Sequence, residues 1–362
     1  MIQFFDNVRL RRFRSMYWLI VLGAVLSILL ILSQSLVSAR TVDTTTIETP
    51  NGTTIVPTPG ADGYKSVTLT AEVIEQELLN ADKKRVVAQT YGFNGGSPGP
   101  TLVFTKGDKV AITVVNNLPE ATSIHWHGVI LPNEMDGVPE AGEPSPLIQP
   151  GESFTYRFTV LQEGTHMYHS HTDTSKQDLL GMGGGLIFLP KKAVSPQVDR
   201  DFVYFLNEWS LPQTLQGDRI KDMARSTSPT DTVNSVTAMP NWTTMMFNFF
   251  TMNGKSFPST EPLDVKLGQR IRLRFFNIGM NTHPMHLHGQ DFMHTEQDGN
   301  AIAPANQAQL NTITVAPGQT QAVEFEAINP GIWPLHCHLA HHVSNNLSSG
   351  FGGMSTVVRI AN

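Results

Sequence analysis

Hydrophobic and polar residues alternate along most of the chain from Ser66 onward. The alternation is clearest in two stretches: Val67, Leu69, Ala71 and Val73, and then Phe154, Tyr156, Phe158 and Val160. A period of two is typical of strands that bury one face. Turn sequences such as Asn94-Gly95-Gly96 separate the stretches, and no amphipathic helix of useful length interrupts them. The pattern predicts an all-β fold built from sandwiches.

The first 39 residues follow a different pattern. Four arginines precede a charge-free, largely apolar run over residues 15–39: Arg9, Arg11, Arg12 and Arg14. About 20 apolar residues span a bilayer as a helix, and the basic side of such a segment stays in the cytoplasm. We expect residues 1–39 to be a cytoplasmic basic tail plus a membrane anchor or signal segment. The apolar run is long for a signal peptide, which favours an uncleaved anchor. The rest of the chain is then exported, to the periplasm or the cell surface.

The remainder is organised as a linker followed by an internal repeat. Residues 40–65 are rich in Thr, Pro and Gly, which predicts a solvated linker without a core. The repeat is carried by three matched pairs of segments: Gly107-Asp108-Lys109-Val110 with Gly268-Gln269-Arg270-Ile271, His125-Trp126-His127-Gly128 with His286-Leu287-His288-Gly289, and His169-Ser170-His171 with His336-Cys337-His338. We therefore predict two homologous β-domains, residues 66–192 and 200–362, with an insertion at 210–250.

Size and composition narrow the class of protein. A chain of 362 residues is too long for one hydrophobic core and fits two domains. A net charge of −6 gives no basic surface for nucleic acid. The single cysteine excludes an internal disulfide framework and a cysteine-based zinc finger.

Candidate chemistry is concentrated in four His-x-His pairs, two in each predicted domain. Residues i and i+2 of a strand point to the same side, so each pair presents two imidazoles to one location. One pair can be incidental, but four pairs placed equivalently in a repeat favour metal ligands. Eight imidazoles exceed the needs of one ion, and imidazole suits zinc, copper, iron and nickel. The eight are His125, His127, His169, His171, His286, His288, His336 and His338.

Three further residues distinguish the second domain from the first. His283, Cys337 and His342 stand where the repeat places Thr122, Ser170 and Ser175 in the first domain. Two histidines and one cysteine, with a weak axial ligand, are typical of a blue-copper site. In an extended segment the side chain of a residue points away from those of its two neighbours. Cys337 can therefore bind one copper while the histidines on either side of it bind others.

These motifs together resemble the four copper signatures of the multicopper oxidases. The motifs are His125-Trp126-His127-Gly128, Tyr168-His169-Ser170-His171, His283-Pro284-Met285-His286-Leu287-His288-Gly289 and His336-Cys337-His338, with Gly92-Phe93-Asn94-Gly95 and Pro98-Gly99-Pro100-Thr101 resembling the start of the first domain. Two domains, with the cysteine in the second, are similar to small, laccase-like enzymes. The resemblance implies two cupredoxin-like Greek-key β-sandwich domains.

The resemblance also implies a role for each matching residue, with four coppers per chain. The resemblance implies that the type 1 copper is bound by His283, Cys337 and His342, and the type 2 copper by His125 and His286. It also implies that the type 3 pair of coppers is bound by the remaining ligands: His127, His169, His171, His288, His336 and His338.

Two positions around these ligands carry expectations of their own. Leu347 takes the axial position of the type 1 site, with Met354 as an alternative neighbour of the copper. Asp136 matches the family's acid near the type 2 site, where a carboxylate can relay protons, although Asp-Gly is also an ordinary turn sequence. Some relatives carry a second acid directly after the last type 1 ligand, but this chain has Val343 at that position.

The function implied is a laccase-like oxidase. A phenolic, aromatic or metal-ion donor is oxidised by one electron at a time, through Cys337, and dioxygen is reduced to water. Relatives with two domains complete their clusters between subunits, which implies a homotrimer. A copper nitrite reductase is the enzyme alternative, but that family carries its cysteine in the first domain and lacks the eight-histidine set. A non-enzymatic copper-storage or electron-transfer protein needs at most the type 1 set.

Overall fold

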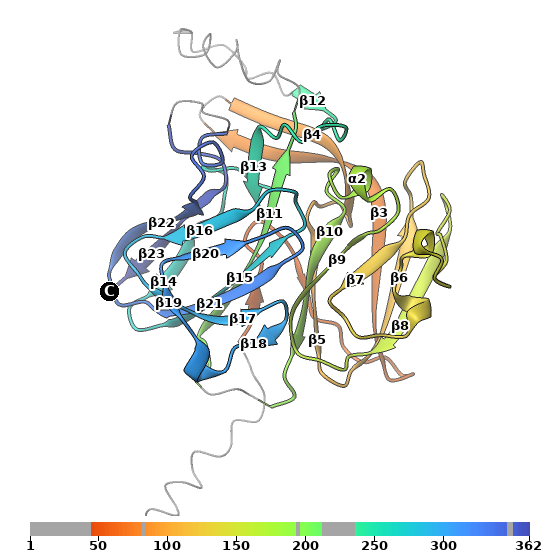
Figure 1. The fold of residues 1–362 in the computed structure, drawn as a ribbon, viewed down its shortest axis with the longest axis horizontal. Coiled ribbons are helices and arrows are strands. Elements are labelled where there is room, and N and C mark those ends of the chain that lie inside the picture. The colour runs from red at the N-terminus through yellow and green to blue at the C-terminus, as the bar shows by residue number, and fades with distance from the viewer. Residues whose placement is uncertain (1–44, 82–83, 193–195, 212–235, 346–349) are drawn as a thin grey trace, which may run out of the picture. The chain divides into compact units, whose positions relative to one another are not determined.

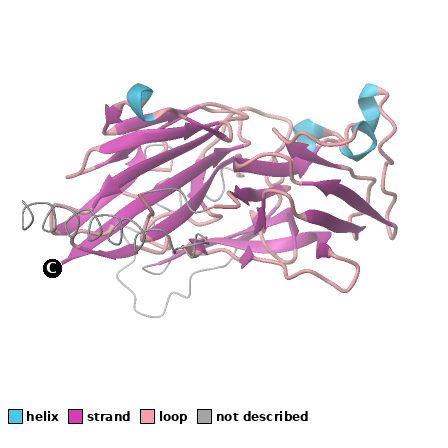
Figure 2. Cartoon of the chain, turned by 90° about the horizontal axis from the view of Figure 1, so that it is seen from below, coloured by secondary structure: helices cyan, strands magenta, loops and turns pink. Residues whose placement is uncertain are grey.

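Strands make up nearly all of the regular structure in the computed structural model. It describes residues 45–362 except 82–83, 193–195, 212–235 and 346–349, so the predicted anchor lies outside the described residues. The described helices are short: α2 (Thr174–Gln177) and 3-10 turns at Asn133–Met135, Pro139–Ala141 and Pro304–Asn306 (Figure 2). None of the helices in this part of the chain is long and apolar enough to cross a bilayer. The prediction of an all-β fold is confirmed.

The first half of the chain supplies most of two five-stranded sheets (Figure 1). One has the order β2 (Thr54–Ile55), β5 (Gly99–Thr105), β10 (Gly183–Leu189), β9 (Gly164–Ser170) and β7 (Ile124–His127). The other has the order β12 (Val236–Ala238), β4 (Lys84–Phe93), β3 (Tyr64–Ala81), β6 (Lys109–Asn116) and β8 (Ser153–Thr159). We call this pair of sheets domain one.

The second half supplies most of the other two sheets, which we call domain two. One has the order β14 (Leu263–Lys266), β23 (Ser355–Ala361), β22 (Gly331–Cys337), β16 (His283–Leu287) and β20 (Thr312–Val315). The eight-stranded sheet has the order β1 (Ile47–Glu48), β11 (Arg200–Trp209), β15 (Arg270–Asn277), β21 (Thr320–Glu326), β17 (Phe292–Gln297) and β18 (Asn300–Ala301), with β13 (Phe249–Met252) beside β11 and β19 (Gln309–Leu310) beside β17.

The alternating stretches place their apolar side chains as predicted, with one exception. Val67, Leu69 and Ala71 are buried in the core of domain one, but Val73 is exposed. The pairing of β3 with β6 ends at Ala71. Beyond that point β3 continues beside β4 alone, so Val73 no longer faces the interior of the sandwich.

In the described part of residues 40–65, the expectation of a solvated linker without a core does not hold at Ile47. Ile47 lies in β1 and is buried in a cluster with Val103, Phe205 and Phe276. β1 pairs with β11 of domain two, whereas β2 pairs with β5 of domain one. Such short strands are added through backbone hydrogen bonds to an open edge, which needs no hydrophobic run in the sequence.

Charged residues fix domain two against β9 of domain one. The buried Arg274 donates to both carboxylate oxygens of Asp201, at 2.8 and 2.9 Å, and to Oγ1 of Thr165 in β9 at 2.5 Å. The backbone N–H of Thr165 donates to Glu296 at 2.7 Å. Burial alone would raise the pKa of Asp201, but Arg274 and Arg272 hold it below its ordinary value. The charge is therefore kept inside the fold.

Replacing Asp201 by asparagine is expected to destabilise the protein by about 3 kcal/mol, because it leaves the buried guanidinium of Arg274 with only Glu296, 3.6 Å away, as a counter-charge. The free energy of unfolding, measured with a chemical denaturant, tests this. Asp264→Asn is the matched control, since Asp264 pairs with Arg359 at an exposed site, and we expect a change within about 0.5 kcal/mol there. Equal effects of the two substitutions on the free energy of unfolding would contradict the stabilising role of the buried pair of Asp201 and Arg274.

Candidate metal centres

A buried trio of His283, Cys337 and His342 forms the first centre. The Sγ of Cys337 lies 3.3 Å from Nδ1 of His342 and 3.9 Å from Nδ1 of His283, and the two nitrogens are 3.2 Å apart. All three residues are 0% exposed. His283 begins β16, Cys337 ends the neighbouring β22, and His342 lies in the turn that follows. The three predicted type 1 ligands therefore converge on one point.

The surroundings of the trio favour uncharged side chains in the absence of a cation. Burial lowers the pKa of His342 to about 3 and raises the pKa of Cys337 to about 12. Nearby cations lower the pKa of a thiol, and thiolate is the form that binds metals. A neutral imidazole likewise keeps a lone pair for a metal. One soft and two imidazole donors facing a single point fit copper.

Glu208, which the sequence did not indicate, orients one member of the trio. The Nε2–H of His283 donates to Oε2 of Glu208 at 2.9 Å, with neither side chain exposed to solvent. The other oxygen of Glu208 accepts the backbone N–H of Asn281 at 2.7 Å. This contact leaves Nδ1 of His283 free on the side of Cys337. Partners of this kind fix the ring and tautomer of metal-binding histidines.

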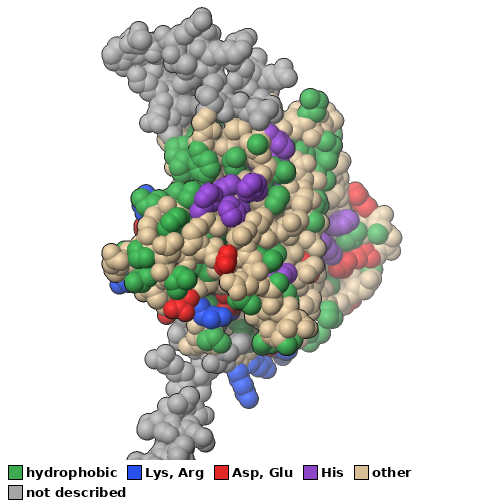
Figure 3. Space-filling model, turned by 60° about the vertical axis from the view of Figure 1, so that its left-hand side comes forward, with side chains coloured by type: hydrophobic (Ala, Val, Ile, Leu, Met, Phe, Trp, Pro, Cys, Tyr) green, Lys and Arg blue, Asp and Glu red, His purple; other side chains and the backbone are tan. Residues whose placement is uncertain are grey.

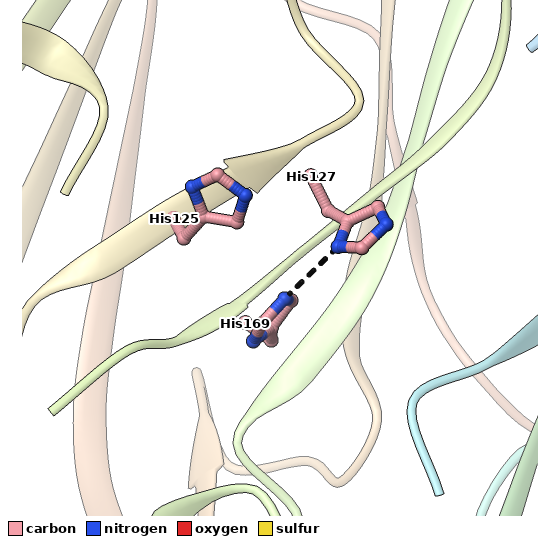
Figure 4. Close-up of side chains that lie close together, drawn as sticks. All are labelled: His125, His127 and His169. Carbon is pink, nitrogen blue, oxygen red and sulfur yellow. Dashed lines mark hydrogen bonds between the residues drawn. The ribbon is translucent and has the colours of Figure 1, made fainter. Parts of the chain in front are cut away.

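The second centre is a quartet of histidines in domain one, which we call quartet one: His125, His127, His169 and His171. The first two lie on β7, and His169 lies directly opposite His125 on β9. The ring of His125 is 5.4–5.7 Å from the other three rings. Nδ1 of His127 is 3.3 Å from Nε2 of His169, as drawn in Figure 4. Burial lowers the pKa of His127 to about 4, so this imidazole is neutral at neutral pH.

Asp136 lies beside quartet one, as predicted. Gly137 has φ of +84°, and a Cβ there would lie 1.8 Å from the carbonyl oxygen of Ile124. Glycine therefore lets this turn press against β7. Nδ1 of His125 is 2.9 Å from the carbonyl oxygen of Asp136 and 3.4 Å from its carboxylate. The backbone carbonyl is the closer acceptor, and the carboxylate stands next to it.

The third centre is the equivalent quartet of domain two, quartet two: His286, His288, His336 and His338. His286 and His336 face each other across β16 and β22. The ring of His286 is 4.7–5.7 Å from the other three rings. His288 and His338 are exposed, and histidines gather on the surface seen in Figure 3. Quartet two is therefore open to a partner surface.

The two quartets do not contact each other within the chain. Among the described residues, every ring contact and hydrogen bond between these histidines joins members of the same quartet. His127 instead lies against Gly318 of domain two. One chain therefore presents two separate sets of four imidazoles.

In domain one, the counterpart of the trio is filled by a glutamine. Gln177 is 1% exposed, and its Oε1 accepts hydrogen bonds from Thr122 at 2.8 Å and Ser170 at 2.5 Å. Those two residues correspond to His283 and Cys337 in the repeat. Ser175, expected opposite His342, is exposed instead. Hydrogen bonds among neutral side chains thus replace the metal donors.

The remaining expectations near the trio are only partly described. Leu347 lies outside the described residues. Met354 is fully buried; its carbonyl accepts the N–H of Cys337 and its N–H donates to the carbonyl of His342, both at 3.0 Å. The axial position therefore stays a prediction, with Met354 fixed to two members of the trio through its backbone.

Comparisons with known proteins agree with this geometry. Two family models, each described as multicopper oxidase, match residues 74–193 and 226–353. The solved multicopper oxidase mgLAC is 30% identical, with a TM-score of 0.64 over 82% of this chain and 86% of that one. The chain belongs to the multicopper oxidase family. Members of this family are copper-dependent oxidoreductases that use oxygen.

Two further relatives show how much of the chain is shared with other members of this family. The blue copper oxidase of Nitrosomonas europaea is 28% identical, with a TM-score of 0.66 over 82% of this chain and 85% of that one. Copper resistance protein A of Pseudomonas syringae pv. tomato is 31% identical over 265 residues, which are 64% of this chain and 42% of that protein. The chain thus spans less than half of this curated relative. Each domain is a cupredoxin-like sandwich.

Proposed function

We propose that the protein is a laccase-like oxidase, which oxidises a reducing substrate one electron at a time and reduces dioxygen to water. The observation that carries the proposal is the position of Cys337. Its side chain belongs to the buried trio, while the residues on either side of it, His336 and His338, belong to quartet two. A short covalent path thus joins the two kinds of site.

The donor sets fit the copper sites of the family. His283, Cys337 and His342 would hold a type 1 copper. His125 and His286 would hold the type 2 copper, and the other six quartet histidines the type 3 pair. Copper bound there would supply one-electron oxidation of the donor and the electrons for dioxygen. The donor we propose is a phenol, another aromatic reductant or a metal ion.

The carboxylate of Asp136 is suited to supplying protons to the copper cluster. Reduction of one dioxygen to two waters consumes four electrons and four protons, so protons must reach quartet one. The carboxylate of Asp136 is partly exposed and lies 3.4 Å from Nδ1 of His125. A group that contacts both solvent and a ligand can hold and pass on a proton. Burial is the main cause that raises the pKa of Asp136 above its ordinary value, which favours a proton on this carboxyl.

We also propose that copies of the chain complete each other's clusters in a closed homotrimer. The separation of the two quartets within one chain supports this assembly. If quartet one of each copy faces quartet two of the next, repetition of the same contact closes a ring. Exposed apolar residues lie on the same strand as a quartet member or shortly after it: Ile130 follows β7, and Ile332 lies on β22 four residues before His336. The proposed contact would bury these two side chains.

Export and anchoring remain part of the proposal. The four arginines and the apolar run over residues 15–39 support a membrane anchor with a cytoplasmic N-terminus. The two domains would then lie outside the cytoplasm.

Copper loading of the purified protein tests the proposed function. We expect an intense blue colour, four coppers per chain, and oxygen uptake when a phenolic donor is added. Colour, metal content and oxygen consumption are measured on one preparation. A colourless protein would refute the proposal. A blue protein that reduces nitrite but not oxygen would indicate a nitrite reductase, and one inert to both would indicate a carrier.

A further inference from the structure

A buried carboxylate that the function above does not use stands behind quartet one. Asp178 directly follows helix α2 and is 6% exposed. Its Oδ2 lies 3.1 Å from Nδ1 of His169, whereas its Oδ1 is buried without a hydrogen-bond partner. An unsatisfied carboxylate oxygen in the interior is costly, so its placement calls for a compensating interaction.

The contact reinforces the nitrogen that His169 offers to a metal, because the carbonyl oxygen of Ser170, 2.8 Å from Nδ1, favours the same tautomer. When Nδ1–H donates to the carboxylate, the proton is held on that side of the ring, and Nε2 keeps its lone pair. Nε2 is the atom that faces quartet one, 3.3 Å from Nδ1 of His127. A carboxylate behind a histidine orients the ring and makes it a stronger metal ligand. Asp178 therefore prepares His169 for a cation.

Gln177, the residue before Asp178, is fixed by side-chain hydrogen bonds. The carboxamide of Gln177 bonds to Thr122 and Ser170, and its Nε2 donates to the carbonyl of Ala121 at 2.9 Å. Ala121 and Thr122 lie just before β7, and Ser170 ends β9; these two strands carry three members of quartet one. The residue that fills the first domain's counterpart of the type 1 site thus fixes the backbone directly before the carboxylate.

The strand geometry itself does not require this carboxylate. Nδ1 of His169 is 2.8 Å from the carbonyl oxygen of Ser170, and Nδ1 of its counterpart His336 is 2.8 Å from that of Cys337. The backbone acceptor is thus the same in both domains. Within the described residues, however, no carboxylate contacts His336. Asp178 is an addition confined to quartet one.

We propose that Asp178 is a positioning residue that sets His169 to bind copper through Nε2. The proposal rests on the proposed function, since it assigns a metal to quartet one. It also makes the cluster asymmetric: domain one would bring both carboxylates, Asp136 and Asp178, and domain two the cysteine through which electrons arrive.

Two substitutions of Asp178 in the full-length, copper-loaded protein test the proposal. Asp178→Ala removes the carboxylate but leaves the carbonyl oxygen of Ser170, and it is expected to weaken copper binding at the type 2 and type 3 sites by about 10- to 100-fold. Asp178→Asn keeps an oxygen acceptor without the charge and should restore part of the loss. Copper content against a competing chelator and electron paramagnetic resonance of the bound copper are the measurements. The blue type 1 band should stay unchanged, because His283, Cys337 and His342 lie in domain two.

Asp173→Asn is the matched control, because Asp173 lies at the start of the same helix but is exposed. It should leave copper binding unchanged. Wild-type copper affinity in Asp178→Ala would overturn the proposal. Joint loss of the blue band and a lower melting temperature of the copper-free protein would also overturn it, because the residue would then be structural. A wild-type protein without type 2 and type 3 copper would instead refute the proposed function itself.

Discussion

Cys337→Ser is expected to abolish the blue colour and the donor-dependent uptake of oxygen, while the other three coppers stay bound. The hydroxyl is close in size to the thiol, so the pairing of Cys337 with Met285 across β22 and β16 should persist. A hydroxyl is a poor ligand for copper compared with a thiolate. His336 and His338 are unchanged, so their copper sites remain. Visible absorption, copper content and oxygen consumption measure the three effects.

The reciprocal change provides the control for this experiment. Ser170→Cys places a thiol at the equivalent position of domain one, where the neighbouring side chains are Thr122 and Gln177. Neither is an imidazole, so no second blue band is expected. A blue Cys337→Ser protein, or one that still consumes oxygen with a phenolic donor, would show that the type 1 site lies elsewhere.

Ile332→Glu is expected to separate the subunits and, with them, the two halves of each cluster. Ile332 is 67% exposed on the strand that carries His336, and a charge buried at such a contact typically costs about 2 kcal/mol or more, ~30-fold in the dissociation constant. We expect a smaller species by analytical ultracentrifugation, loss of the type 2 and type 3 copper, and retention of the blue band. The trio should survive because it is complete within one chain.

Val56→Glu is the matched control for the assembly. Val56 is 62% exposed and follows β2, at the opposite edge of its sheet from β7 and quartet one. This variant should keep the size and the activity of the wild type. A monomeric Ile332→Glu protein that still reduces dioxygen would show that one chain completes its own cluster, which contradicts the proposed trimer.

The candidate ligands could be picked out by local rules, whereas their division into copper types came from the resemblance to a family. The period of two places His125 and His127 on one side of a strand, and the repeat shows the equivalent pair, His286 and His288, in the second domain. The same rule sends Cys337 to the other side from His336. The structure brings His283 and His342 to that side, where the difference between the two repeats had placed them.

The supporting residues could not be predicted in the same way. Glu208 reaches His283 from 75 positions away in the sequence, and a single buried acid produces no periodic pattern. Gln177 and Asp178 lie in a four-residue helix and its cap, too short to give a helical signal. Their importance comes from tertiary contacts, and the same holds for Ile47 in the segment expected to be a solvated linker.

Each half of the chain contributes one short edge strand to a sheet of the other half. β1 precedes domain one but pairs with β11 of domain two, and β12 comes from the second half but pairs with β4 of domain one. A cut near residue 196 would therefore strip one edge strand from each fragment and leave the backbone groups of β11 and β4 open to foreign strands. Each half of the chain therefore takes one of its edge strands from the other half.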